Sequence, residues 1–219
     1  MKKQLLCLML SVLFVTACEQ DVYDKGDSTY SYVRADFVEA YVDNDRSVSQ
    51  VLTDDNVRLQ LTVPYAASWI QRPDTTYRAV LYYNQKGQQA EAVNLQRVST
   101  ASIKTTQQLR DGAKTDPLKL ESVWLSGNKR YLNLSVILMM GAVSDEAASH
   151  ALGIVGDTIM VGDDGLRTYH LRLAHSQGDV PQYYSQRVYF SVPVYGLPVD
   201  SLRLSVNTYD GVVTKGFRL

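Results

Sequence analysis

The sequence has 219 residues, of which 45% are hydrophobic and 21% are charged, and its formal net charge is −1. This composition supports packed cores rather than disorder, and the near-zero net charge excludes a strongly basic footprint for nucleic acid. The length predicts one large domain or two small ones.

The first 17 residues have the composition of an export signal. Lys2 and Lys3 form a short positive segment, and an apolar run extends from Leu5 to Ala17. This run is too short to span a bilayer, which requires about 20 apolar residues. A charged start followed by a short apolar run is typical of a cleaved secretory signal. Removing residues 1–17 takes away two lysines and no acid, so the net charge changes from −1 to −3.

Cys18 directly follows the predicted cleavage site, in the order Val-Thr-Ala-Cys. This order resembles the bacterial lipobox, in which the cysteine sulfur receives a diacylglyceryl group before the signal is cut. We therefore expect Cys18 to carry several acyl chains, such as palmitate, and to anchor the protein to the outer membrane, facing the periplasm or the cell surface. The other interpretation is an ordinary signal with a chance cysteine. Because Cys7 leaves with the signal, no disulfide, redox pair or thiolate metal site is expected.

Residues 18–29 are polar and acidic and predict a flexible tether. Beyond the tether the chain shows two-residue periodicity and no long amphipathic helix, which predicts an all-β protein. Short strands close together in the first half predict a five-stranded, OB-like barrel over residues 30–110. The candidate strands are residues 30–42, 47–53, 57–63, 77–83 and 89–98. Alternation in the third of them predicts that Val57, Leu59, Leu61 and Val63 face inward.

The polar segment 99–117 lacks alternation, ends in proline and marks a domain boundary. The strands after it predict a β-sandwich over residues 111–219. Alternation predicts inward faces at Leu132, Leu134, Val136, Leu138, Met140, Tyr169, Leu171, Leu173, Tyr184, Val188, Phe190, Val192, Leu202, Leu204 and Val206. Turns are expected at residues 84–87, 126–128, 162–165 and 210–211, and one short helix at residues 145–152.

Several stretches resemble a known family. SVWLSGNKRYLNLSV and LRLAHSQGDVPQYYSQRVYFSVPV are similar to the carboxy-terminal half of the NigD-like lipoproteins, and VLTDDNVRLQL, RPDTTYRAVLYYN and AEAVNLQRV are similar to the amino-terminal half. The resemblance is strongest at Trp124, Tyr131–Asn133 and Asp179–Ser185. It implies an OB domain followed by a β-sandwich, in a cell-envelope lipoprotein for which bacteriocin immunity was proposed. It implies no catalytic residue.

One barrel turn departs from the family pattern. The usual aspartate–glycine hairpin reads Asp54-Asp55-Asn56 here. Asparagine tolerates the left-handed backbone geometry that such a turn requires. We therefore expect the turn to form.

The histidines offer little support for metal or acid–base chemistry. The positions of His170 and His175 on one predicted strand differ by an odd number, so their side chains point to opposite faces. His150 lies elsewhere in the sequence. We expect ordinary exposed histidines, no metal and no cofactor. His175, Ser176 and Asp179 in HSQGD leave a serine-hydrolase alternative, but a hairpin with Gly178 at its turn is the preferred interpretation.

Aromatic residues are the candidates for ligand binding. Trp69 either stacks on a sugar ring or closes one end of the barrel, and we favour closure. Trp124 follows the alternation of its strand, which predicts core or inter-sheet packing. Further along the chain, tyrosines predict an exposed aromatic strip that would contact a partner. These are Tyr183, Tyr189, Tyr195 and Tyr209.

Taken together, these features predict a non-catalytic, lipid-anchored cell-envelope protein. Its expected role is to bind a protein partner, in a bacteriocin-immunity-like or envelope-protective function. The alternative is a surface lipoprotein that binds glycans, since an abundance of tyrosine suits sugar-binding and protein-binding surfaces alike.

Overall fold

The structure is a computed structural model that describes residues 32–109, 113–142 and 149–219. The predicted signal, Cys18 and the tether lie outside the described residues, as do residues 145–148 of the predicted helix. The described remainder of that helix prediction is wrong, because Leu152 lies in strand β10 (Ala151–Val161). In the described ranges the only helix is the 3-10 turn η1 (Thr106–Gln108), and none is long and apolar enough to cross a bilayer.

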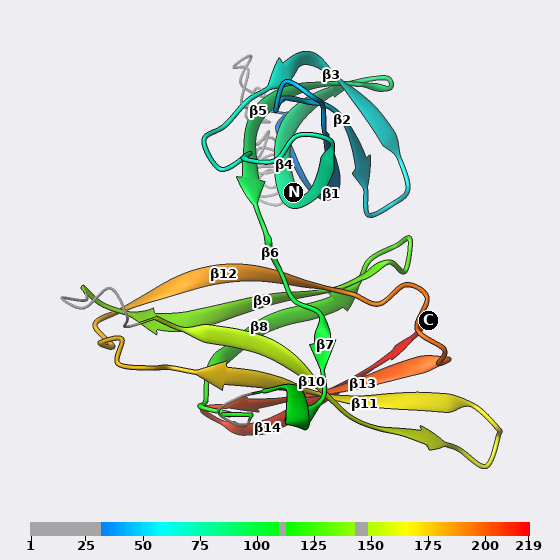
Figure 1. Cartoon of the computed structure of the whole chain (residues 1–219), viewed down its shortest axis with the longest axis vertical. Coiled ribbons are helices and arrows are strands. Elements are labelled where there is room, and N and C mark those ends of the chain that lie inside the picture. The colour runs from blue at the N-terminus through cyan, green and yellow to red at the C-terminus, as the bar shows by residue number, and fades with distance from the viewer. Residues whose placement is uncertain (1–31, 110–112, 143–148) are drawn as a thin grey trace, which may run out of the picture. The chain divides into compact units, whose positions relative to one another are not determined.

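Five strands form a closed barrel in the order β1-β2-β3-β5-β4, which confirms the predicted OB-like fold. Alternate residues of each strand point into it, as Val38 and Ala40 do from β1. In Figure 1 the barrel strands run from blue to green. Their bounds are β1 (Arg34–Val42), β2 (Val48–Thr53), β3 (Arg58–Tyr65), β4 (Thr75–Lys86) and β5 (Gln89–Arg97).

The alternation predicted for β3 holds only in its middle. Leu59 and Leu61 are buried, but Val57 is 42% exposed and Val63 is 71% exposed, so the inward prediction is wrong for these two. The pairing of β3 with β5 involves only Gln60 and Leu61. The residues on either side therefore extend past the closed part of the barrel, where no opposite wall covers them.

Left-handed residues close two barrel turns. Asn56 has φ 64° in the β2–β3 turn, so asparagine does replace the usual glycine there. The β4–β5 turn starts later than predicted, because residues 84–86 continue β4. Gly87, with φ 63°, makes that turn.

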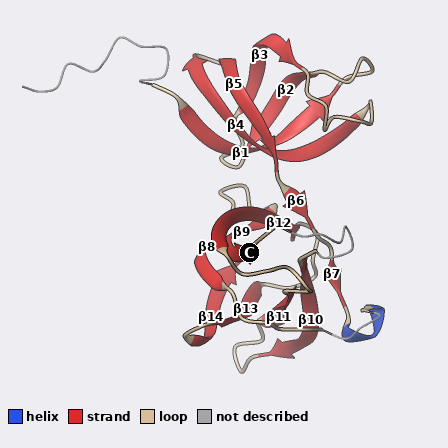
Figure 2. Cartoon of the chain, turned by 90° about the vertical axis from the view of Figure 1, so that its left-hand side faces the viewer, coloured by secondary structure: helices blue, strands red, loops and turns tan. Residues whose placement is uncertain are grey.

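The second half of the chain forms a β-sandwich of two sheets, which confirms the predicted class. One sheet has the order β14-β13-β11-β10-β7, and the other has the order β6-β12-β9-β8. Figure 2 shows the sheets as two layers. Besides β10, the main strands of the sandwich are β8 (Lys119–Leu125), β9 (Tyr131–Met140), β11 (Arg167–Ser176), β12 (Tyr184–Pro193), β13 (Ser201–Thr208) and β14 (Gly211–Arg218).

The sandwich core follows the predicted alternation, with one exception. The aliphatic side chains predicted to face inward from β9, β11 and β13 are buried or packed against the core, and so are Val188, Phe190 and Val192 of β12. Tyr184 is 55% exposed, so its inward prediction is wrong. It pairs with Met140 at the last position of the β9–β12 ladder, where the opposite sheet no longer covers it.

The polar segment after the barrel contributes one short strand to each sheet. Strand β6 (Ser99–Thr100) pairs with β12, and β7 (Ile103–Lys104) pairs with β10, both in parallel. Figure 1 traces this path from β5 through β6 and β7. Gly178 makes a turn with φ 57°, but it connects β11 to β12, which belong to different sheets. The predicted hairpin is therefore a connection between sheets.

Candidate functional site

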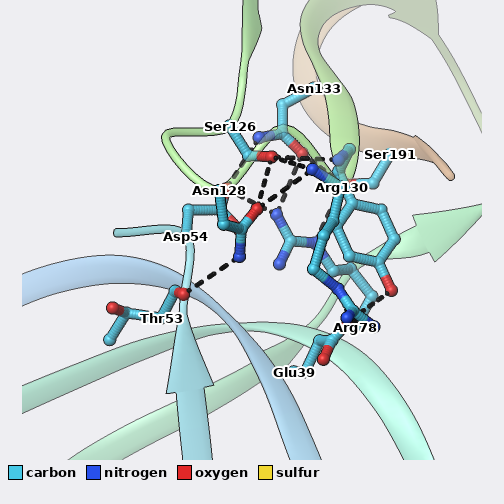
Figure 3. Close-up of polar contacts among 10 residues, drawn as sticks. Glu39, Thr53, Asp54, Arg78, Ser126, Asn128, Arg130, Asn133 and Ser191 are labelled. Carbon is cyan, nitrogen blue, oxygen red and sulfur yellow. Dashed lines mark hydrogen bonds and ion pairs between the residues drawn. The ribbon is translucent and has the colours of Figure 1, made fainter. Parts of the chain in front are cut away.

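A buried arginine joins the barrel to the sandwich. Arg78 of β4 is only 4% exposed and points out of the barrel. Its Nη2 donates to Asp54 Oδ2 at 2.6 Å and to Asn133 Oδ1 at 3.0 Å, and its Nε donates to Ser191 Oγ at 3.3 Å. Figure 3 shows these groups converging from both halves. One side chain thus connects a barrel turn to two sandwich strands.

A second ion pair lies beside the first. Glu39 of β1 is buried and accepts a hydrogen bond from Arg130 Nε at 3.1 Å and one from the Tyr131 hydroxyl at 2.8 Å. Burial, followed by the hydrogen bond to Glu39, raises the pKa of Tyr131. The phenol therefore remains a protonated donor at neutral pH. Figure 3 shows Glu39 and Arg130 next to the Arg78 cluster.

Aromatic rings complete this junction. Phe37 of β1 meets Trp124 and Tyr189 edge to face, with ring centroids 5.2 and 5.4 Å apart. The Arg78 guanidinium lies over the Tyr131 ring at 4.2 Å, a cation–π contact. Trp124 is predicted from the sequence to pack in the core or between the two sheets. That prediction is wrong, because its ring packs on Phe37 of the barrel.

The β8–β9 turn rests on the β2–β3 turn. The backbone N–H of Asn128 donates to the Asp54 carbonyl at 2.6 Å, and Asn128 Nδ2 donates to the Thr53 carbonyl at 3.3 Å. A Cβ at Gly127 would lie 2.6 Å from Asp55 Oδ1, so glycine permits this approach. We define the junction as these two turns with the Arg78 and Glu39 clusters. Most of its polar groups pair with one another across the two halves of the fold. Among the described residues, Arg78 Nη1 and Asp54 Oδ1 are buried without a hydrogen-bond partner.

An apolar cleft of about 440 Å³ lies in the sandwich, beside β6. Its apolar lining comes from both sheets and from the β11–β12 connection. Pockets that bind ligands typically have volumes of about 300–1,000 Å³ and mostly apolar walls, so the cleft has a suitable size and lining. The apolar lining residues are Leu138, Met140, Leu152, Val180, Val188 and Phe190, and His150 and Gln186 add polar groups.

The structure does not gather the predicted tyrosine strip into one patch. Tyr183 and Tyr195 are exposed but stand at opposite ends of β12, whose ten residues span about 33 Å. Tyr189 is half-buried against Phe37. Tyr209 lies in the turn before β14, in the other sheet.

Trp69 packs on the barrel rather than standing free. Its ring is half-buried against the barrel core and meets Tyr77 edge to face at 5.5 Å. Trp69 is therefore in contact with the barrel core, and its closure of the barrel end stays a prediction.

A separate polar groove of about 900 Å³ runs beside β2, β3 and the β4–β5 turn. It is lined mainly by amide side chains, with Arg58 and Val57 among them. The amide residues are Gln50, Asn56, Gln60, Gln88 and Gln89.

The histidines differ from their prediction. His175 is 2% exposed, so the expectation of an ordinary exposed histidine is wrong for it. Its Nδ1 lies 2.9 Å from the Asp116 carbonyl and its Nε2 lies 3.1 Å from His150 Nδ1. Both ring nitrogens are therefore engaged by groups other than serine. In the described part of the chain, no three His, Cys, Asp or Glu side chains gather as a metal site would require.

No family model and no curated protein matches the sequence. Solved structures do match the fold. A NigD-like immunity protein from Bacteroides caccae has 23% identity and a TM-score of 0.63, over 84% of this chain and 96% of that one. A structure named as a toxin-related protein, from Parabacteroides distasonis, has 15% identity and a TM-score of 0.63, and the match covers 85% of this chain and 93% of that one. One named as a lipoprotein, from Bacteroides fragilis, has 14% identity and a TM-score of 0.56, and the match covers 84% of this chain and 96% of that one. The fold expected from the family resemblance is therefore confirmed.

Proposed function

We propose that this chain is a NigD-like lipoprotein of the cell envelope, anchored at the outer membrane through Cys18, that binds a protein partner without catalysis. Three lines of support agree. The Val-Thr-Ala-Cys order predicts lipidation, the fold matches a NigD-like immunity protein over nearly its whole length, and neighbouring structures are named as toxin-related and as a lipoprotein. Binding a toxin, as an immunity protein would, is a function that requires no catalytic group.

The apolar cleft is the observation that carries the binding proposal. Protein interfaces draw most of their affinity from a few apolar or aromatic side chains buried in pockets. The cleft offers such a pocket, with Leu138, Val188 and Phe190 on its wall and a volume of about 440 Å³. Gln186 is exposed at the cleft and would lie at the edge of the contact.

A photo-crosslinking residue at Gln186, introduced in the native cells, is expected to give one discrete protein adduct on irradiation. The reason is that Gln186 lines the cleft while remaining accessible to a partner. Mass spectrometry of the adduct identifies the protein that is attached. A crosslinker at Tyr209, which is exposed in the turn before β14, provides the matched control and is expected to give no such adduct.

A second variant shows whether the cleft itself binds. Thr100→Trp places an indole at the cleft wall, on the short strand β6, and is expected to reduce the Gln186 adduct at least tenfold. Equal adducts at Gln186 and Tyr209, or an adduct that Thr100→Trp leaves unchanged, would contradict binding in the cleft.

The amide-lined groove favours glycan binding as the second candidate function. OB barrels bind oligosaccharides on the face of strands 2 and 3 and on neighbouring loops, and the groove lies on that face. Amide groups both donate and accept hydrogen bonds, as sugar hydroxyls require.

If this candidate is correct, Gln60→Ala with Gln89→Ala is expected to weaken binding of neutral oligosaccharides on an array at least tenfold. Trp69→Ala is expected to leave it unchanged, because Trp69 does not line the groove. An array with no signal for the native chain would remove the candidate.

A further inference from the structure

His150 and His175 meet through their ring nitrogens. His150 Nδ1 lies 3.1 Å from His175 Nε2, a hydrogen-bond distance. The ring planes differ by 12° and the centroids are 5.3 Å apart. With nitrogens this close and centroids this far apart, the rings lie edge to edge in nearly one plane. The lone pair of each facing nitrogen therefore points at the other ring.

The outer nitrogens of both rings face backbone carbonyls. His175 Nδ1 lies 2.9 Å from the Asp116 carbonyl, and His150 Nε2 lies 3.0 Å from the Met139 carbonyl. A carbonyl oxygen only accepts hydrogen bonds, so each of these nitrogens must carry a hydrogen. A neutral imidazole has only one N–H. If both rings were neutral, neither facing nitrogen would carry a hydrogen, and two lone pairs would oppose each other at 3.1 Å.

One added proton removes this conflict. We propose that His150 and His175 bind a single shared proton between Nδ1 of one ring and Nε2 of the other, as a buried site with one positive charge. The proton turns a repulsive contact into a charge-assisted hydrogen bond, which is stronger than a neutral one. A metal ion fits the same gap poorly because of direction: the facing lone pairs point at each other along one line, whereas a tetrahedral metal requires them to converge at an angle. On that line, two bonds of about 2.0 Å would require a nitrogen separation near 4 Å.

The surrounding groups favour one proton and oppose a second. The charged group facing the pair is the Asp116 carboxylate, which also accepts the backbone N–H of Gln177 at 2.8 Å. The Gln177 amide donates to the Met139 carbonyl and contributes no charge. Burial, the largest cause, and the nearby His150 lower the pKa of His175, while its bond to the Asp116 carbonyl and the Asp116 charge raise it. A doubly charged pair is therefore disfavoured.

The proton site is connected to the apolar cleft. His150 lines the cleft. The residue before it, Ser149, lies close to Gly178, because a Cβ added at Gly178 would lie 2.7 Å from the Ser149 carbonyl oxygen. The shared proton holds the 149–150 segment against β11. Loss of the proton at raised pH restores the repulsion, so the cleft wall loosens at His150.

The pair has a predictable effect on stability. In the unfolded chain each histidine binds a proton near pH 6.5. Under the shared-proton arrangement, the charge-assisted hydrogen bond holds the first proton of the folded pair more tightly than a free histidine holds its own, while burial and the charge already present oppose the second. Below about pH 6.5 the unfolded chain holds two protons and the folded chain holds one, so acid lowers stability. Above it the folded chain alone holds a proton, so stability falls as pH rises. The contribution of the pair therefore peaks near pH 6.5.

Two measurements on the full chain test the proposal. Histidine ¹⁵N spectra between pH 5 and pH 9 are expected to show one proton taken up by the pair above pH 6.5, with Nδ1–H on His175 and Nε2–H on His150. Urea unfolding across the same range is expected to lose its maximum in His150→Asn and to keep it in the matched control His170→Asn. His170 is a suitable control because it lies on β11 outside the pair.

Contrary results are equally definite. Two independent titrations near pH 6.5 in the ¹⁵N spectra would overturn the proposal, whether or not His150→Asn folds. Elemental analysis showing a metal bound to the native chain, with both facing nitrogens shifted and the shift reversed by a chelator, would replace the shared proton with a metal site.

Discussion

Replacing Arg78 with methionine is expected to destabilise the protein by about 3–5 kcal/mol, the cost typical of breaking a buried ion pair from one side. The guanidinium is the common partner of Asp54, Asn133 and Ser191. Without it the Asp54 carboxylate, of which only 14% is exposed, loses its counter-ion. Because Arg78 joins the barrel to the sandwich, we also expect unfolding to lose its single cooperative step. Urea denaturation followed by tryptophan fluorescence measures both effects.

The matched control is Arg172→Ala. Arg172 pairs with Asp157 at 2.7 Å, but both side chains are about one-third exposed. Exposed pairs contribute about 0–1 kcal/mol, so this variant should remain close to the native stability. Arg78→Lys keeps the charge, but its single nitrogen cannot stand in for both Nη2 and Nε, so it should lose at least the hydrogen bond to Ser191 and have a stability between those of the two variants. If Arg78→Met unfolds like Arg172→Ala, the junction does not couple the two halves.

Replacing Cys18 with serine is expected to abolish lipid attachment and with it the outer-membrane anchor. A serine hydroxyl cannot take the place of the sulfur in the thioether to lipid, so no acyl chain would be attached. Each buried methylene contributes about 0.8 kcal/mol of membrane affinity, and a stable anchor requires at least two chains. Fractionation of cells after metabolic labelling with palmitate measures both attachment and lipid content. The variant should carry no label and should be missing from the outer-membrane fraction.

Cys7→Ser provides the control for this experiment. Cys7 is the other cysteine of the chain and lies inside the predicted signal, whose cleavage would remove it. Its replacement should leave both the membrane fraction and the label unchanged. Palmitate found on a Cys18→Ser protein, or an unlabelled native protein, would show that the export signal carries no lipidation site.

Two-residue periodicity predicts most of the strands, and it fails where strands end. Leu59 and Leu61 are buried in the middle of β3, whereas Val63 lies past the pairing with β5 and within the register shift of the β2–β3 ladder. Tyr184 fails for the same reason at the start of β12. Alternation states which residues share a face, but it carries no information on how far the opposite layer extends.

The junction and the histidine pair were beyond prediction because they depend on contacts between distant parts of the chain. Arg78 stands in a strand of ordinary composition, and nothing in its neighbourhood indicates that the sandwich covers its outward face. Comparing His170 with His175 on one strand could not reveal that His150 meets His175 from another segment. Trp124 and Asn133, where the family resemblance is strong, both belong to the junction. The resemblance is therefore strong at residues of the junction, but it did not indicate that these residues contact the barrel.

The two short strands after the barrel impose an order on folding. Strands β6 and β7 each have two residues and are held by parallel pairing with β12 and β10, which come much later in the chain. Two residues cannot form a strand alone, and closing so long a loop costs entropy before any bond repays it. The barrel closes from its own consecutive segments, so it can form during synthesis. Its attachment to the sheets must wait until β12 has emerged and paired.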